Sequence, residues 1–253
     1  MSTGCTRRRS LVSNIESSPD PESLRYELKV AGQEASYHRL RMALELQPEA
    51  IRTLYPPRQV QSIYLDSHFG CALEENLAGI SHREKLRLRW YGAETRGVVG
   101  KLELKVRENM LGWKRTTQVD RRLDVQGALR SEFARELQAS LPDAWRIRMA
   151  GLEPAQWISY EREYFITADH KVRLTIDRNV RTWDQRWRGR LSARALDETP
   201  KGRIFVLELK CSPEAIEVAE ALVQRLPWPV GRCSKFVLAS DPTHGPTPSL
   251  EPI

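Results

Sequence analysis

The chain has 253 residues, of which 40% are hydrophobic and 8% aromatic, so it can bury the core of one large domain or of two small ones. Lys and Arg number 40 against 33 Asp and Glu, which gives a net charge of +7. A basic protein of this kind favours polyanionic partners. Nucleic acid, membrane phosphates and polyphosphates all remain open on this basis. There is no run of about 18 apolar residues, so we expect neither a signal peptide nor a membrane span.

The two ends of the chain differ in composition from the part between them. Residues 1–22 are rich in Ser, Pro and Arg, and residues 241–253 are rich in Pro, which predicts a disordered leader and a disordered tail around one domain at 23–240. The four cysteines are far apart and form no C-x-x-C pair. We therefore expect reduced thiols, no zinc site and a cytoplasmic location.

The predicted elements follow one another without a Gly/Ser linker. Ser212-Pro213-Glu214 suits the start of a helix, with Ser as N-cap and Pro at the first helical position. Residues 156–167 and 171–180 suit a hairpin that turns at Ala168-Asp169-His170. The spacing of apolar residues elsewhere in the chain predicts strands at 24–31, 59–66, 83–91, 100–107, 111–119 and 203–210. It predicts helices at 34–47, 73–80, 131–140 and 212–226.

One triplet recurs on three predicted strands: Glu27-Leu28-Lys29, Glu103-Leu104-Lys105 and Glu208-Leu209-Lys210. Because strand side chains alternate between faces, each triplet puts both charges on one face, and the segment 83–90 repeats this with Arg and Lys at odd positions. A solvated face of an antiparallel sheet is the simplest explanation for a single strand. Like charges at cross-strand spacing are destabilising, however, so several such strands indicate an anion held against them.

The predicted fold class is α+β, an antiparallel β-barrel with helices packed outside. The helix at 212–226 is amphipathic through Ile216, Ala219, Leu222 and Val223, and it requires an apolar surface to cover. If helices cover the apolar face, a twisted sheet of about eight strands closes with its charged face inward. The result is a barrel with a polar, cationic bore.

The order of several short motifs resembles the VTC domain, the polyphosphate polymerase branch of the triphosphate tunnel metalloenzymes, or CYTH superfamily. The resemblance covers residues 25–238 and implies a tunnel that binds a nucleoside triphosphate or polyphosphate together with Mn²⁺ or Mg²⁺. In fungi the domain is joined to membrane domains that this chain lacks, which implies a possible membrane-protein partner that recruits it to the membrane. The motifs are Ile63-Tyr64-Leu65-Asp66-Ser67, the segment 85–92, Leu102-Glu103-Leu104-Lys105, the segment 160–164, the segment 173–177, Leu207-Glu208-Leu209-Lys210 and Ser234-Lys235-Phe236.

One departure separates the chain from the hydrolases of this superfamily. Those enzymes begin with E-x-E-x-K, in which two carboxylates serve the metal, whereas this chain has Arg25 in place of the first acid of Arg25-Tyr26-Glu27-Leu28-Lys29. The change favours the polymerase branch over a two-metal hydrolase. It also makes Glu27 a doubtful ligand.

The resemblance assigns roles to individual residues, each of which could instead be a charge on a strand surface. Lys29, Arg87, Arg89 and Lys235 would be catalytic, holding the phosphates around the transferred group. Glu208 would bind the metal, with Glu103 as a helper. The substrate-binding set would be Lys105, Tyr160, Arg162, Arg173, Lys210 and Ser234.

The function implied is metal-dependent transfer of the ATP γ-phosphate onto inorganic polyphosphate. Phosphoryl transfer requires cations and a metal that neutralise and align the phosphates, so no nucleophilic side chain is needed. The alternatives are hydrolysis of tripolyphosphate or nucleoside triphosphate, and a non-catalytic module that binds polyphosphate or RNA; no specific nucleic acid is expected. The basic aromatic segment from Trp183 to Arg190 fits base stacking, a tunnel-mouth loop or a partner contact.

Overall fold

The computed structural model describes residues 25–108, 111–199, 203–240 and 247–248. The predicted leader at 1–22 and most of the predicted tail at 241–253 lie outside these residues. The helices are α1 (Tyr37–Glu45), α2 (Cys71–Leu77), α3 (Arg130–Ala139), α4 (Asp143–Met149), α5 (Ile216–Gln224) and α6 (Lys235–Ser240). The strands are β1 (Tyr26–Gln33), β2 (Arg52–Ser67), β3 (His82–Tyr91), β4 (Lys101–Glu108), β5 (Leu111–Gln118), β6 (Leu152–Ile166), β7 (Val172–Asp184), β8 (Ile204–Cys211), β9 (Gly231–Arg232) and β10 (Thr247–Pro248).

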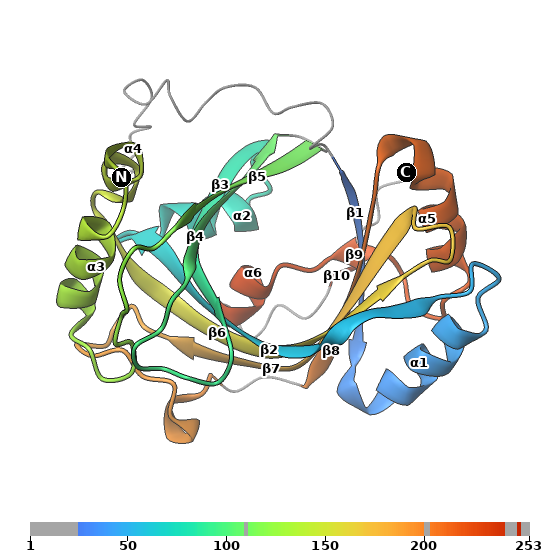
Figure 1. The fold of residues 1–253 in the computed structure, drawn as a ribbon, viewed down its shortest axis with the longest axis horizontal. Helices are drawn as coiled ribbons and strands as arrows, with labels where there is room; N and C mark the ends of the chain where they lie inside the picture. Colours follow the sequence, from blue (N-terminus) through green and yellow to red (C-terminus); the bar gives the residue numbers. More distant parts are fainter. Residues whose placement is uncertain (1–24, 109–110, 200–202, 241–246, 249–253) are drawn as a thin grey trace.

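Eight strands form one antiparallel sheet in the order β1-β8-β7-β6-β2-β3-β4-β5. The sheet is strongly curved, so that its two edge strands bend toward the same side (Figure 1). Within the described residues β1 and β5 are not paired with each other, and closure into a barrel is therefore not confirmed. The α+β class and the antiparallel arrangement agree with the prediction.

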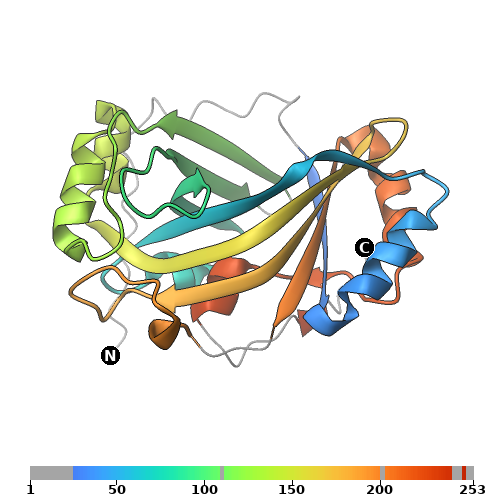
Figure 2. The same cartoon turned by 60° about the horizontal axis from the view of Figure 1, so that its bottom comes forward.

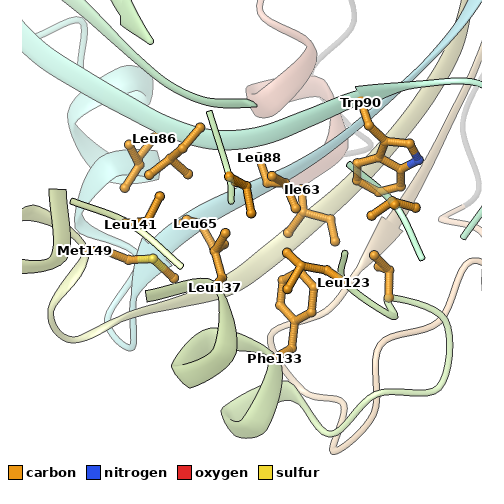
Figure 3. Close-up of a cluster of buried hydrophobic side chains, with 14 of the residues drawn as sticks. Ile63, Leu65, Leu86, Leu88, Trp90, Leu123, Phe133, Leu137, Leu141 and Met149 are labelled. Carbon is orange, nitrogen blue, oxygen red and sulfur yellow. The ribbon is translucent and has the colours of Figure 1, made fainter. Parts of the chain in front are cut away.

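The convex face of the sheet is apolar and is covered by helices at two places. At one end, Leu86 and Leu88 of β3 pack with Phe133 and Leu137 of α3 and with residues of α4 (Figure 3). At the other end, α1 and α5 cover β1, β7 and β8 (Figure 2). Alternation of apolar and charged residues along β1, β3, β4 and β8 explains this arrangement, because the apolar residues of these strands face the helices on the convex side.

The concave face holds a helix that the sequence did not predict. The ring of Phe236 in α6 stacks on Tyr64 of β2 with centroids 4.9 Å apart, and it is almost fully buried in a cluster with Ile158 and Tyr160 of β6. Figure 1 shows α6 inside the curve of the sheet. This apolar cluster fills one part of the concave side and leaves the rest to charged residues.

Other elements depart from the predicted boundaries. The strand predicted at 59–66 extends over Arg52–Ser67, with register shifts on either side of Tyr55, and α4 was not predicted at all. The helix predicted from Ser212 begins as a 3-10 turn at Pro213–Ala215 that precedes α5. Both long strands and the turn between them at 168–170 follow the prediction closely.

Two further expectations concern cysteines and the membrane. Cys211 and Cys233 are buried free thiols, whereas Cys71 is disulfide-bonded, so the expectation of reduced cysteines is wrong at that position. Among the helices of the described residues, none has the length and apolar character needed to cross a bilayer.

Candidate functional site

Charged residues from most strands of the sheet converge on its concave face. They occupy alternate positions on each strand, which is why the apolar residues between them all face the helices. The polar and charged side chains gathered there are Glu27 and Lys29 of β1, Glu208 and Lys210 of β8, Asp177 of β7, Tyr160 and Arg162 of β6, Tyr64 of β2, Lys85, Arg87 and Arg89 of β3, and Glu103 and Lys105 of β4.

Lys105 and Glu27 connect the two ends of the sheet. The Nζ of Lys105 on β4 lies 2.7 Å from Oε2 of Glu27 on β1, although five strands separate β4 from β1 in the sheet order. Lys29 Nζ lies 2.8 Å from the other oxygen of Glu27. Burial alone would raise the pKa of Glu27, but Lys29 and Lys105 bring it down to about 2. A side-chain ion pair thus spans the concavity where no backbone ladder closes it.

Glu208 lies beside this pair. Its Oε1 is 2.5 Å from Lys210 Nζ, and its side chain is almost completely buried. Burial works against ionisation, yet Lys210 and Lys29 hold the pKa of Glu208 well below its usual range. Burial likewise opposes the charge of Lys29, but Glu27 and Glu208 raise its pKa. These groups are therefore charged at neutral pH.

Arg87 and Arg89 of β3 are held by a shared carboxylate and by two tyrosines. Arg87 donates to Glu103 Oε2 through Nε and Nη2 at 2.9 and 2.7 Å, and its Nη1 donates to the Tyr64 hydroxyl at 2.8 Å. Arg89 Nη2 donates to the Tyr160 hydroxyl at 2.8 Å and Nη1 lies 3.5 Å from Glu103. The two guanidinium groups are thereby fixed side by side before any ligand arrives.

Asp177 is a central residue that the sequence interpretation did not include among the site residues. Its carboxylate is fully buried and accepts two hydrogen bonds from Arg162, at 2.6 and 2.8 Å, while Lys235 of α6 lies 2.5 Å away. Burial would raise the pKa of Asp177, but Arg162 and Lys235 keep it below its usual range. The alternation Arg173, Thr175, Asp177 along β7 was the available signal, because it places Asp177 on the charged face.

Lys85 is the least neutralised cation of the site. Its Nζ donates to the Ser234 hydroxyl at 2.8 Å, and the structure gives it no carboxylate within ion-pair distance in the described residues. Burial and the nearby Lys29 and Lys105 hold the pKa of Lys85 well below its usual range. The pKa of Lys105 is also lowered, first by burial and then by Lys29. Positive charge therefore exceeds what the carboxylates of the site neutralise.

Within the described residues, the cations of the site outnumber its carboxylates. The carboxylates are Glu27, Glu103, Asp177 and Glu208, and the cations in contact with them or with each other's neighbours include Lys29, Lys85, Arg87, Arg89, Lys105, Lys114, Arg162, Lys210 and Lys235. The structure brings together the predicted site residues of this face except Arg173. Arg173 shares the face but is exposed, near the start of β7.

The acidic residues can be compared as metal ligands. No group of three or more His, Cys, Asp or Glu side chains suitable for a metal occurs in the part of the chain that is described. Glu103 is surrounded by Arg87, Arg89 and Lys114, which occupy both of its oxygens. Glu208, whose ion pair with Lys210 involves one oxygen, fits better, since Mg²⁺ and Mn²⁺ sites often combine one or two carboxylates with substrate phosphates.

The segment from Trp183 to Arg190 lies apart from this face. Trp183 is buried against Trp157 on the convex side, and its Nε1 donates to the Arg194 carbonyl. Arg186 and Arg188 pair with Asp184 and Asp197, and the side chain of Trp187 is 82% exposed beside the start of β6. The segment is therefore not part of the charged face.

Comparison with known proteins identifies the family. The sequence matches the VTC domain over residues 25–243. The chain belongs to the VTC-domain family. This membership places it among triphosphate-handling proteins, a class that contains both phosphotransferases and hydrolases and that generally uses divalent metal ions. No curated protein matches the chain significantly.

Several solved structures are similar to this chain at low identity and with TM-scores below 0.5. The PH1819 protein from Pyrococcus horikoshii is 13% identical, with a TM-score of 0.46 over 85% of this chain and 97% of its own. A putative adenylate cyclase from Vibrio parahaemolyticus is 11% identical, with a TM-score of 0.48 over 84% and 97%. The Mimivirus capping enzyme triphosphatase is 10% identical, with a TM-score of 0.39 over 80% and 88%.

Proposed function

We propose that this VTC domain is a metal-dependent phosphotransferase that moves the γ-phosphate of ATP onto inorganic polyphosphate. The substrates would lie on the concave face, between β1 and β8 on one side and β3 and β4 on the other. A cytoplasmic site of action and a membrane-protein partner remain predictions from the sequence.

The observation that carries the proposal is the excess of positive charge around the half-buried Lys85. A partly desolvated ammonium without a carboxylate is costly, and its lowered pKa is in line with that cost. A chain of phosphates would neutralise Lys85, Lys105 and Lys29 together, because consecutive phosphates each present oxygens to a different cation. A single small anion would neutralise only part of the group.

The residues of the site suit phosphoryl transfer. Arg87 and Arg89 are pre-oriented by Glu103, Tyr64 and Tyr160, so they need little reorganisation to bind equatorial phosphate oxygens. Fixed cations on both sides of the concavity would hold the attacking and leaving oxygens in line. A metal ion held by Glu208 would supply further neutralisation of the phosphate oxygens.

In a polymerase the attacking group is a phosphate already bound on this face, and in a hydrolase it is water. No described feature favours a water-activating base here, since all four carboxylates of the site are engaged by cations. We therefore propose polymer synthesis in preference to hydrolysis. Hydrolysis and simple binding are the outcomes against which it is tested.

The experiment is an incubation of the purified chain with ATP and Mn²⁺, in which ADP, free phosphate and polyphosphate are measured together. Synthesis predicts ADP and polymer in matching amounts with little free phosphate. ADP with an equal amount of free phosphate would show hydrolysis instead. If neither appears with Mn²⁺ or Mg²⁺, although tripolyphosphate binds, the domain is a binding module.

A further inference from the structure

Three tyrosines surround an arginine where the charged face ends. The guanidinium carbon of Arg58 lies 5.9 Å from the ring centroid of Tyr55, 5.8 Å from that of Tyr91 and 6.0 Å from that of Tyr164. Tyr55 and Tyr164 meet edge to face with centroids 5.9 Å apart. Half of the surface of Tyr55 and of Tyr91 is exposed. We call these four residues the tyrosine cluster.

The tyrosine cluster continues the charged face on two strands. Tyr164 follows Arg162 by two residues on β6, and Tyr91 follows Arg89 by two residues on β3. Side chains two apart on a strand point to the same face about 7 Å from each other. The tyrosine rings therefore lie one step beyond two of the cations that we assign to the phosphates.

Arg58 forms no ion pair within the described part of the chain. No carboxylate there lies within ion-pair distance of this guanidinium, which contacts the three rings. Most other arginines near the site are held by Asp or Glu, as Arg162 is by Asp177. Within the described residues, Arg58 thus presents N–H donors that no carboxylate engages, next to exposed aromatic rings.

Exposed aromatic rings next to a free guanidinium suit a planar, nitrogen-containing ring. Such a ring can stack on tyrosine, and its ring nitrogens or exocyclic oxygens can accept hydrogen bonds from Arg58. A polyphosphate chain gains nothing from the rings, and at this end it would meet one cation in place of several. The occupant expected here is the uncharged end of a ligand whose other end is a chain of phosphates.

We propose that the tyrosine cluster binds the base of the nucleoside triphosphate whose phosphates lie among Arg89 and Arg162. This inference rests on the proposed function, because it requires the phosphates on the charged face. It assigns the direction in which the ATP donor lies, with its base toward Tyr91 and Tyr164 and its terminal phosphate toward Lys85 and Lys29.

The test compares ATP with inorganic tripolyphosphate by calorimetry on the full chain and on the variants Tyr91→Leu and Tyr164→Leu. Loss of a stacking ring is expected to weaken ATP binding about tenfold in each variant. Tripolyphosphate affinity should stay within about twofold, since no phosphate contact is removed. Unfolding curves of the variants check that the fold is intact.

Trp187→Leu is the matched control. Its ring is also exposed, but it lies beside Glu153, eleven residues before Tyr164 on the same long strand and roughly 35 Å away along it. ATP and tripolyphosphate binding should both be unchanged in this variant.

The outcomes separate the base site from the proposed function. If wild type binds tripolyphosphate and ATP, and the tyrosine variants lose neither or lose both equally, the base site is wrong while the phosphate site stands. If wild type binds neither ligand, the phosphate site fails and the base site fails with it. Selective loss of ATP in the tyrosine variants and not in Trp187→Leu supports the proposal.

Discussion

Replacing Asp177 by Asn would remove the carboxylate that Arg162 and Lys235 share. The side chain of Asp177 is fully buried, and its two oxygens accept bonds of 2.6 and 2.8 Å from Arg162, with Lys235 at 2.5 Å from one of them. Asn has nearly the same shape but no charge, and its amide group opposes one of the donors. Two buried cations would then lack their counter-ion.

Removing one partner of a buried ion pair costs about 3–5 kcal/mol, so the free energy of unfolding of Asp177→Asn should fall by that amount. For a chain of this size the melting temperature should fall by roughly 6–20 °C. Urea and thermal unfolding followed by circular dichroism measure both values. Asp143→Asn is the control, because Asp143 is 92% exposed and its pair with Arg146 should contribute less than about 1 kcal/mol.

Two further readouts follow from the same contact. Because the pKa of Asp177 is lowered in the folded protein, its stabilising effect is present above pH 3.8 and is lost as the pH falls below that value, so wild type and variant should converge in acid. Tripolyphosphate should stabilise the variant more than wild type, since it offers charge to the freed cations. A loss below about 1 kcal/mol, no larger than that of Asp143→Asn, would refute the reasoning, because Asp177 would then not be sealed from water.

Three other predictions concern turnover and binding. Arg87→Ala and Arg89→Ala should each cut the rate of polymer synthesis by about a hundredfold while weakening ATP binding much less, because the other cations still bind ATP in the ground state. Equal effects on rate and affinity would contradict this prediction. Glu208→Gln should raise the Mn²⁺ concentration needed for half-maximal turnover. Glu103→Gln should not, because the Glu103 carboxylate is already engaged by arginines and a lysine. An unchanged Mn²⁺ requirement in Glu208→Gln would show that the metal binds elsewhere. Lys85 should hold its proton more tightly when tripolyphosphate is bound, because its lowered pKa rises next to an anion, so affinity should fall as the pH rises through the pKa of the free form. An affinity for tripolyphosphate that falls equally in Lys85→Met and in wild type over that pH range would contradict this.

The charged face was predictable because alternation along a strand is a local property. Lys29, Arg87, Arg89, Lys105 and Glu208 each occupy the predicted face, since the apolar residues between them determine which side meets the helices. The sequence also indicated that like charges would meet. It did not show that carboxylates of the chain itself neutralise part of this positive charge.

The ion-pair partners could not be predicted because they depend on the order of strands. Lys105 and Glu27 are 78 residues apart, and Lys235 meets Asp177 only because α6 enters the concave side of the sheet. That helix has six residues, too few for a helical periodicity to be recognised, and the stacking of Phe236 on Tyr64 determines its place. The position of α6 is therefore determined by tertiary packing, and no local sequence pattern predicts it.

The tyrosine cluster was missed for a related reason. Tyr55 and Arg58 flank a register shift in β2, where simple alternation no longer tells which face a residue occupies. Tyr91 and Tyr164 come from strands that are neighbours of β2 in space and are 73 residues apart in sequence. Only the assembled sheet brings the rings together around the arginine.

The central claim is that the concave face binds a chain of phosphates, and calorimetry at low salt tests it most directly. Tripolyphosphate should bind at least about a hundredfold more tightly than orthophosphate, because each further phosphate adds charge-assisted hydrogen bonds of about 1.5–3 kcal/mol. The preference should weaken as salt screens the cations. Equal affinities for orthophosphate and tripolyphosphate would contradict the account.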